Sequence, residues 1–89
     1  MQLKSPLKTY TIWFCDSDPK IQETGFEVCL ALITLDFPVK IVLAVHDENL
    51  NLKLDSLKNE EMVSIYDKKS ISFTVYENLL ENFDFLLVF

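Results

Sequence analysis

The chain has 89 residues, 49% of them hydrophobic, and its 14 acidic and 8 basic residues give a formal net charge of −6. A chain of this length forms one domain, expected over residues 1–89, and leaves much of its surface outside the core. The high apolar content therefore predicts an oligomer, in which a partner covers part of that surface. Because the chain is acidic and contains no arginine, we expect no direct contact with nucleic acid or with a membrane.

Targeting and metal-binding signals are weak throughout the chain. The first residues, MQLKSPLK, lack the apolar segment and cleavage site of a secretory signal, which predicts a cytoplasmic protein. The longest apolar region is too interrupted for a membrane span, by Glu27, Asp36, Pro38 and Lys40. Two cysteines outside any CxxC spacing and one histidine make no metal site, and a single glycine makes no phosphate-binding loop, so no cofactor is expected.

The first half of the chain predicts a strand, a helix and a second strand. Residues 7–14 are rich in β-formers, with Tyr10, Ile12 and Phe14 on one face and Trp13 on the other.

A helix follows a loop over residues 15–23. Thr24 with Glu27 forms a capping box, so the helix is expected from Thr24 to about Asp36. Pro38 helps to end it, and residues 39–45 then read as an unbroken apolar strand, which is typical of a parallel sheet covered on both faces.

The predicted helix is apolar on two sides. One stripe at helical spacing consists of Phe26, Cys29, Leu30, Ile33 and Phe37, and the second of Val28, Leu32 and Leu35. One stripe can face the sheet, whereas the other needs a different cover. Val28, Leu32 and Leu35 are therefore the candidates for an interface with a partner, while Cys29 is interpreted as a small buried hydrophobic residue.

The second half predicts further alternation of helices and strands. Leucines at i, i+4 and i+7 favour a helix over residues 49–58, although LNLKL also alternates like a strand. Residues 62–66 form a short strand and 67–69 a turn. Thr74 and Glu77 make a second capping box, which predicts a helix over residues 75–83 with Tyr76, Leu79, Leu80 and Phe83 facing inward.

Residues 84–89 form the closing strand. These elements together predict an α/β fold, a three-layer αβα domain whose mostly parallel sheet has four or five strands. Residues 62–73 are too few for a crossover helix between parallel strands, so either one strand is antiparallel or this piece is irregular.

Candidate site residues follow the first two strands, where α/β folds place ligand contacts. Cys15 is a possible thiol site, since a nearby helix N-terminus stabilises a thiolate, and Asp16 and Ser17 lie beside it. Against this, Asp16 and Asp18 oppose a thiolate. His46 and Asp47 form a possible acid/base pair at the same edge, although a lone histidine in a charged turn is more often solvated.

Two known uses of a cysteine at this position do not fit the loop. A phosphatase loop needs an arginine where Ile21 stands, and a thioredoxin dithiol needs a second cysteine where Asp18 stands. Cys15 is therefore interpreted as inert or structural, with slow alkylation and no stable persulfide.

Four segments carry a pattern shared with a known family, namely Phe26–Leu32, Pro38–Leu43, Asp47–Leu50 and Leu79–Phe89. They resemble the DsrE/DsrF/DsrH sulfur-relay family, and most of all its TusC/DsrF subgroup. The family's apolar helix is similar to Phe26–Leu32, its Pro-Val strand to Pro38–Leu43, and its Asp-Gly turn to Asp47–Leu50. Its closing helix and strand are similar to Leu79–Phe89. The chain departs from the pattern where Glu48 replaces the turn glycine, and where residues 62–69 lack the carrier cysteine of the catalytic subunits.

The resemblance implies a shortened DsrE/F-like subunit without catalytic residues. Its partners would be DsrE/TusD-like and DsrH/TusB-like subunits, in an assembly that passes sulfur toward 2-thiouridine in tRNA. A homo-oligomeric binding module of the same fold, without a role in sulfur transfer, is the alternative.

Overall fold

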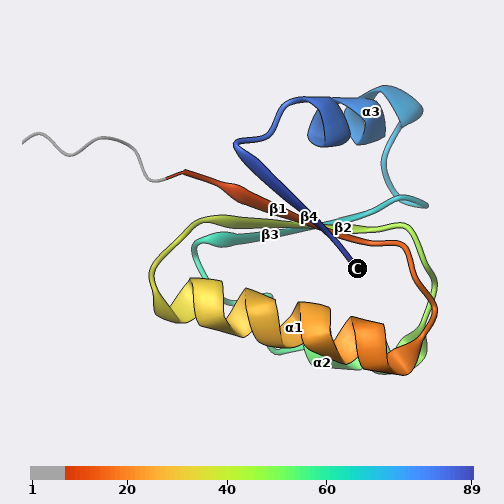
Figure 1. Cartoon of the computed structure of the whole chain (residues 1–89). Helices are drawn as coiled ribbons and strands as arrows, with labels where there is room; N and C mark the ends of the chain where they lie inside the picture. Colours follow the sequence, from red (N-terminus) through yellow and green to blue (C-terminus); the bar gives the residue numbers. More distant parts are fainter. Residues whose placement is uncertain (1–7) are drawn as a thin grey trace, which may run out of the picture.

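The computed structural model describes residues 8–89 (Figure 1). Its elements are, in order, β1 (Tyr10–Phe14), α1 (Pro19–Thr34), β2 (Val39–Leu43), α2 (Glu48–Asp55), β3 (Val63–Asp67), α3 (Phe73–Glu81) and β4 (Phe85–Val88). The strands form a sheet in the order β3-β2-β1-β4, and every neighbouring pair is parallel. Figure 1 shows α1 and α2 on one face of the sheet and α3 on the other, so the predicted α/β fold with a parallel sheet is confirmed.

The alternation of β1 divides the core into two parts. Ile12 and Phe14 are fully buried in the cluster under α1 and α2, with Tyr10 packed against it, whereas Trp13 packs with Tyr76 under α3. These are the faces predicted from the period-2 pattern of the strand. Of the predicted strand over residues 7–14, Leu7 lies outside the described residues.

The predicted start of α1 is wrong. The helix begins at Pro19, and its N-cap is Asp18, whose carboxylate accepts a hydrogen bond from the Lys20 N–H at 2.9 Å. Proline suits this position because its fixed φ is helical and its missing N–H would have no helical partner. Thr24 lies inside the helix, where its hydroxyl donates to the Lys20 carbonyl at 3.0 Å. Residues 19–23 are therefore helical and not part of a loop.

The C-terminal end of α1 is a Schellman motif. The Phe37 N–H donates to the Leu32 carbonyl and the Asp36 N–H to the Ile33 carbonyl, both at 3.0 Å. Asp36 has a φ of 64°, the left-handed conformation that this motif requires and that aspartate tolerates better than most residues. The helix thus ends at Thr34, before the predicted Asp36.

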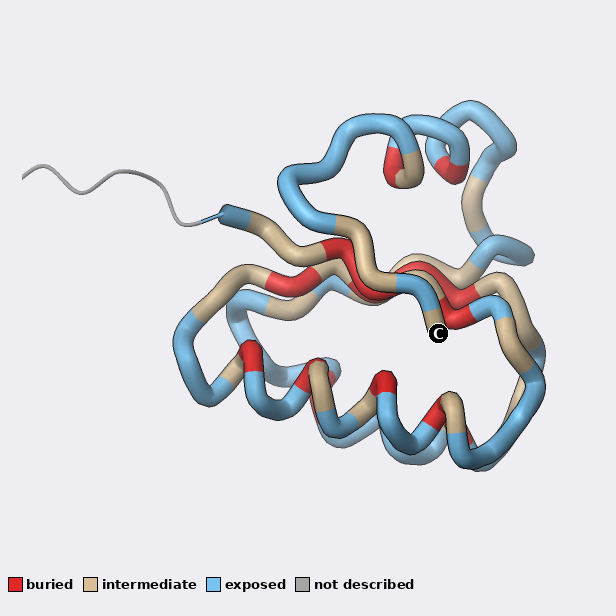
Figure 2. The backbone as a smooth tube through the Cα atoms, in the orientation of Figure 1, coloured by how far each residue is buried: buried red, intermediate tan, exposed pale blue. Residues whose placement is uncertain are grey.

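The two predicted stripes of α1 are not separate surfaces. Figure 2 shows the buried residues of the helix along the side that faces the sheet. Cys29 and Leu32 lie in the core, and Val28 is half-buried against it. Leu32 is therefore not available for an interface, and of the three candidates only Leu35, 65% exposed, lies on the surface.

Gly25 brings α1 close to the sheet. A Cβ at this position would lie 2.5 Å from Phe14 Cε1 and 2.9 Å from Phe89 Cγ. Real Cβ atoms do not approach aromatic carbons so closely, so the helix can sit at this distance only because the residue has no side chain. Gly25 thereby fixes the helix over β1 and the end of β4.

In the second half of the chain, the structure confirms the helix over the leucine repeat as α2. It corrects the predicted strand direction and the predicted bounds of the last helix. The antiparallel alternative for residues 62–73 is wrong, since β3 is parallel to β2, and residues 68–72 are irregular. Helix α3 begins at Phe73 because Ser72, not Thr74, is its N-cap and accepts a hydrogen bond from the Val75 N–H at 3.2 Å. It ends before Asn82, which leaves Phe83 43% exposed and not inward.

No helix within residues 8–89 combines the length and apolar character needed to cross a bilayer.

Candidate functional site

The carboxyl ends of all four strands lie at one edge of the sheet because the strands are parallel. The chain moves from β1 outward to β2 and β3, and then returns to place β4 on the other side of β1. The strand order therefore reverses between β1 and β4, which is where open α/β sheets bind ligands. The loop after β1 and Phe89 after β4 meet at this point.

The loop after β1 is closed by hydrogen bonds within the chain. The N–H groups of Cys15 and Asp16 both donate to the Phe89 carbonyl, at 2.7 and 3.1 Å, and the Asp18 N–H donates to Asp16 Oδ1 at 2.8 Å. The side chain of Gln22, only 4% exposed, donates from Nε2 to the Asp16 carbonyl at 3.0 Å. The backbone donors that would hold a phosphate in nucleotide-binding folds are thus occupied, and two carboxylates stand beside them.

The two cysteines differ sharply in environment. Cys15 is exposed, and the charged side chains of its loop are the carboxylates of Asp16 and Asp18. Cys29 is a fully buried residue of α1, and burial raises the pKa of its thiol from 9.0 to about 12. Because the thiolate is the nucleophile, Cys29 is unreactive in the folded chain.

The predicted pair of His46 and Asp47 does not form an acid/base arrangement. Asp47 is the N-cap of α2, and its Oδ1 accepts a hydrogen bond from the Leu50 N–H at 3.0 Å. His46 is exposed, and in the described part of the chain no hydrogen bond joins it to a carboxylate.

His46 lines a depression of about 350 Å³ at the carboxyl ends of β2 and β3, together with Asp67, Lys68 and Lys69. The Lys68 Nζ lies 5.0 Å from the centre of the Tyr76 ring. Cys15, Asp16 and Ser17 therefore follow β1, whereas His46 and Asp47 follow β2. Cys15 is not among the residues that line the depression beside His46.

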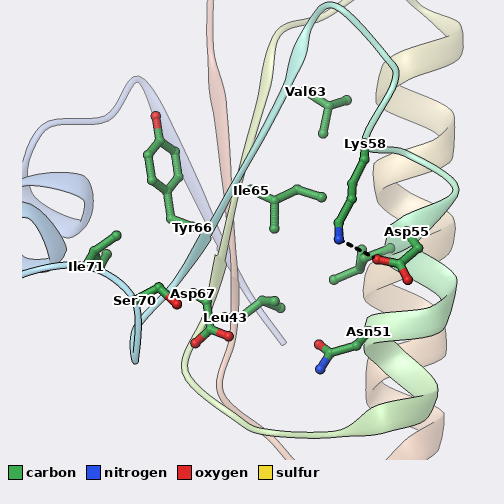
Figure 3. Close-up of a pocket in the computed structure, with 11 residues that line it drawn as sticks. Leu43, Asn51, Asp55, Lys58, Val63, Ile65, Tyr66, Asp67, Ser70 and Ile71 are labelled. Atoms are coloured by element: carbon green, nitrogen blue, oxygen red, sulfur yellow. Dashed lines mark ion pairs between the residues drawn. The ribbon is translucent and has the colours of Figure 1, made fainter.

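A groove lies along the edge of the sheet formed by β3, and Figure 3 shows its lining. This groove has a volume of about 630 Å³. Its lining combines apolar and aromatic side chains, those of Leu43, Leu54, Val63, Ile65, Tyr66 and Ile71, with polar ones, those of Asn51, Asp55, Lys58, Asp67 and Ser70. Lys58 and Asp55 form an exposed ion pair at 2.8 Å. Neither a cysteine nor a histidine lines the groove, so its side chains can bind a partner but provide no nucleophile of that kind.

Sequence reasoning missed the β3 groove and Gln22. The groove forms only because α2 stands beside an edge strand, and edge position depends on strand order, which hydrophobic periodicity does not report. Gln22 falls in the loop predicted over residues 15–23 because the predicted helix starts at Thr24, five residues after the observed start at Pro19. The Asp-Pro pair at residues 18–19 was the signal that could have corrected this.

Within residues 8–89, no group of three or more histidine, cysteine or acidic side chains is arranged to hold a metal ion. Comparison with protein-family models, with curated proteins and with solved structures finds no match to this chain.

Proposed function

We propose that this chain is a non-catalytic subunit of a sulfur-relay assembly of the DsrE/DsrF/DsrH kind, acting in the cytoplasm. In this role it binds a partner subunit that carries the persulfide, and it supports transfer toward 2-thiouridine in tRNA. The observation that carries the proposal is the groove at the β3 edge, whose mixed apolar and polar lining offers a partner both contact area and hydrogen-bonding groups and contains no thiol.

The segments that resemble the family lie in elements of one connected unit. They fall in α1, β2, the start of α2, and α3 with β4. The departure at Glu48 has a structural reason. Asp47 caps α2, and Glu48 is simply its first helical residue. No positive φ occurs at Glu48, so a glycine is not needed there.

The environment of Cys15 supports a subunit without a carrier thiol. Cys15 is exposed, the charged side chains of its loop are carboxylates, and the chain contains no arginine that could bind an anionic sulfur group there. The partner, a DsrE/TusD-like or DsrH/TusB-like subunit, would therefore supply the reactive cysteine.

Affinity capture of the full chain from its native cells tests the proposal. The expected result is retention of a DsrE-family subunit with a carrier cysteine. Lys58→Glu in the lining of the groove should weaken retention at least tenfold, whereas Lys53→Glu, the same charge reversal at an exposed position of α2 outside the groove, should not. Capture of no DsrE-family subunit, or equal loss with both variants, would refute the proposal.

A homo-oligomeric binding module of the same fold is the second candidate. Strand β4 favours it, because β4 lies at an edge of the sheet with Phe85 and Val88 44% and 53% exposed, and such an edge pairs readily with an identical one. The level of 2-thiouridine in tRNA separates the two candidates. Deletion of the gene should lower it if the chain belongs to a sulfur relay and leave it unchanged if the chain is a module of the second kind.

A further inference from the structure

Strand β4 presents an unprotected apolar edge. It pairs with β1 on one side, and no strand within residues 8–89 pairs with its other side. Edge strands are normally shielded by charged residues, proline or a bulge. Residues 85–89 contain neither a charge nor a proline, and Phe83, Phe85 and Val88 are 43%, 44% and 53% exposed. The opposite edge, β3, differs because Ser64 and Asp67 interrupt its apolar residues.

The register of β4 identifies which backbone groups are free. The Phe85 N–H donates to the Thr9 carbonyl at 3.3 Å, and the Phe89 N–H donates to the Trp13 carbonyl at 2.8 Å. Peptide groups alternate in direction along a parallel strand, so Phe85, Leu87 and Phe89 bond toward β1. The N–H and C=O groups of Leu86 and Val88 therefore point away from the sheet.

We propose that the β4 edges of two copies of this chain pair antiparallel about a two-fold axis. Leu86 of one copy then exchanges both backbone hydrogen bonds with Val88 of the second copy, and the reverse pair does the same. Leu87 lies opposite its own counterpart at the axis. This register uses every free group of both residues, and it joins the two four-stranded sheets into one of eight strands.

The side chains fit this register. Leu86 and Val88 lie on the α3 face, where α3 packs on Trp13, Val42 and Tyr66 and leaves Val88 largely uncovered. Leu86 would therefore contact Val88 of the second copy across the axis. On the other face, Phe85 stacks on Tyr10 with ring centres 4.8 Å apart and would lie beside Phe89 of the second copy. Apolar cross-strand pairs of this kind stabilise sheets.

Symmetry favours a second copy as the occupant, and the side-chain charges at the β4 edge do not oppose it. Two chains of net charge −6 repel each other, but the side chains of residues 85–89 are uncharged, so the paired strands bring no like-charged side chains into opposition. An isologous contact also shields both exposed edges at once with the same residues. The inference rests on the second candidate function, self-association, and does not require a role in sulfur relay.

Sedimentation equilibrium of the full chain, with circular dichroism as a check of folding, tests the pairing. The wild-type chain should be a dimer. Val88→Lys should weaken the dimer at least tenfold, because it places two lysines at the contact, whereas Leu52→Lys at a 69% exposed position of α2 should not.

A second variant, Leu86→Pro, removes only an N–H that points outward, so it should give a folded monomer. A wild-type monomer overturns both the pairing and the self-association on which it rests. A dimer that survives Val88→Lys and Leu86→Pro overturns the β4 pairing while leaving self-association in place.

Discussion

Gly25→Ala should destabilise the domain, although alanine is the better helix former. In an ordinary helix interior this change stabilises by about 1 kcal/mol. Here the new Cβ would lie 2.5 Å from Phe14 Cε1, 2.9 Å from Phe89 Cγ and 3.0 Å from Phe14 Cζ. Phe14 is fully buried, so its ring is surrounded by other core side chains.

The expected size follows from these opposing effects. Overpacking a well-packed core costs about 1–3 kcal/mol, and the contact with Phe14 places this site at the upper end of that range. After the gain in helix propensity, a net loss of about 1–2 kcal/mol in the free energy of unfolding remains. In a domain of this size, each kcal/mol lowers Tm by about 4–8 °C.

Urea unfolding of the wild-type and variant chains measures the loss. Ala31→Gly, at an exposed position of the same helix, is the matched control and should lose about 1 kcal/mol through propensity alone. Phe14→Leu removes the ring atoms that clash, so Gly25→Ala should cost less in that background than in the wild type. Unfolding free energies equal to or above the wild-type value for Gly25→Ala would refute the close approach of α1 to the sheet.

Asp18→Ala should lower the free energy of unfolding by about 1 kcal/mol because it removes the N-cap of α1, whereas Thr24→Ala should change it by less than about 0.5 kcal/mol; equal losses would contradict the helix start at Pro19. Burial raises the pKa of Cys29 in the folded chain to about 12, so only the unfolded chain loses this proton just above pH 9, and stability should fall as the pH rises from there. The unfolding free energy, measured by urea unfolding at each pH, should fall by up to about 1.4 kcal/mol per pH unit in the wild-type chain and less steeply in Cys29→Ala. Identical slopes for the two chains would argue against the buried thiol. Alkylation followed by intact mass should modify Cys15 no faster than a peptide thiol and leave Cys29 unmodified until the chain unfolds. After incubation with a sulfur donor neither cysteine should gain a sulfur atom, and a gain abolished by Cys15→Ser would make the chain a carrier.

The fold class follows from patterns that depend on burial. The alternation of β1 predicted which of its side chains face each layer, because a strand covered on both faces must bury both sets. Continuous apolar residues likewise located β2 and β4 within a residue or two. Strand order was not accessible in this way, since it depends on where the chain crosses the sheet after β3.

The boundaries of helices were less predictable because several residues compete for each cap. Thr24 and Thr74 both have the capping-box spacing, yet Asp18 and Ser72 cap the helices earlier in the chain. A cap sets only one end of a helix, while packing of the apolar face decides how far the helix extends. The same competition affects the candidate site. Asp47 is the N-cap of α2, so its carboxylate is already hydrogen-bonded to the helix and is not a free acid/base group.

The position of β4 beside β1 also determines the order in which the sheet can be completed. The Thr9 N–H donates to the Asp84 carboxylate, so this contact joins residues 75 positions apart. During synthesis, β1, β2 and β3 emerge first, and β1 keeps one edge unpaired until α3 and β4 have followed. Closing so long a loop is entropically costly, and parallel pairing of distant segments is slow. We therefore expect the completion of the sheet at β4 to be a late step in folding, so that substitutions that weaken β4 raise the unfolding rate more than they lower the folding rate.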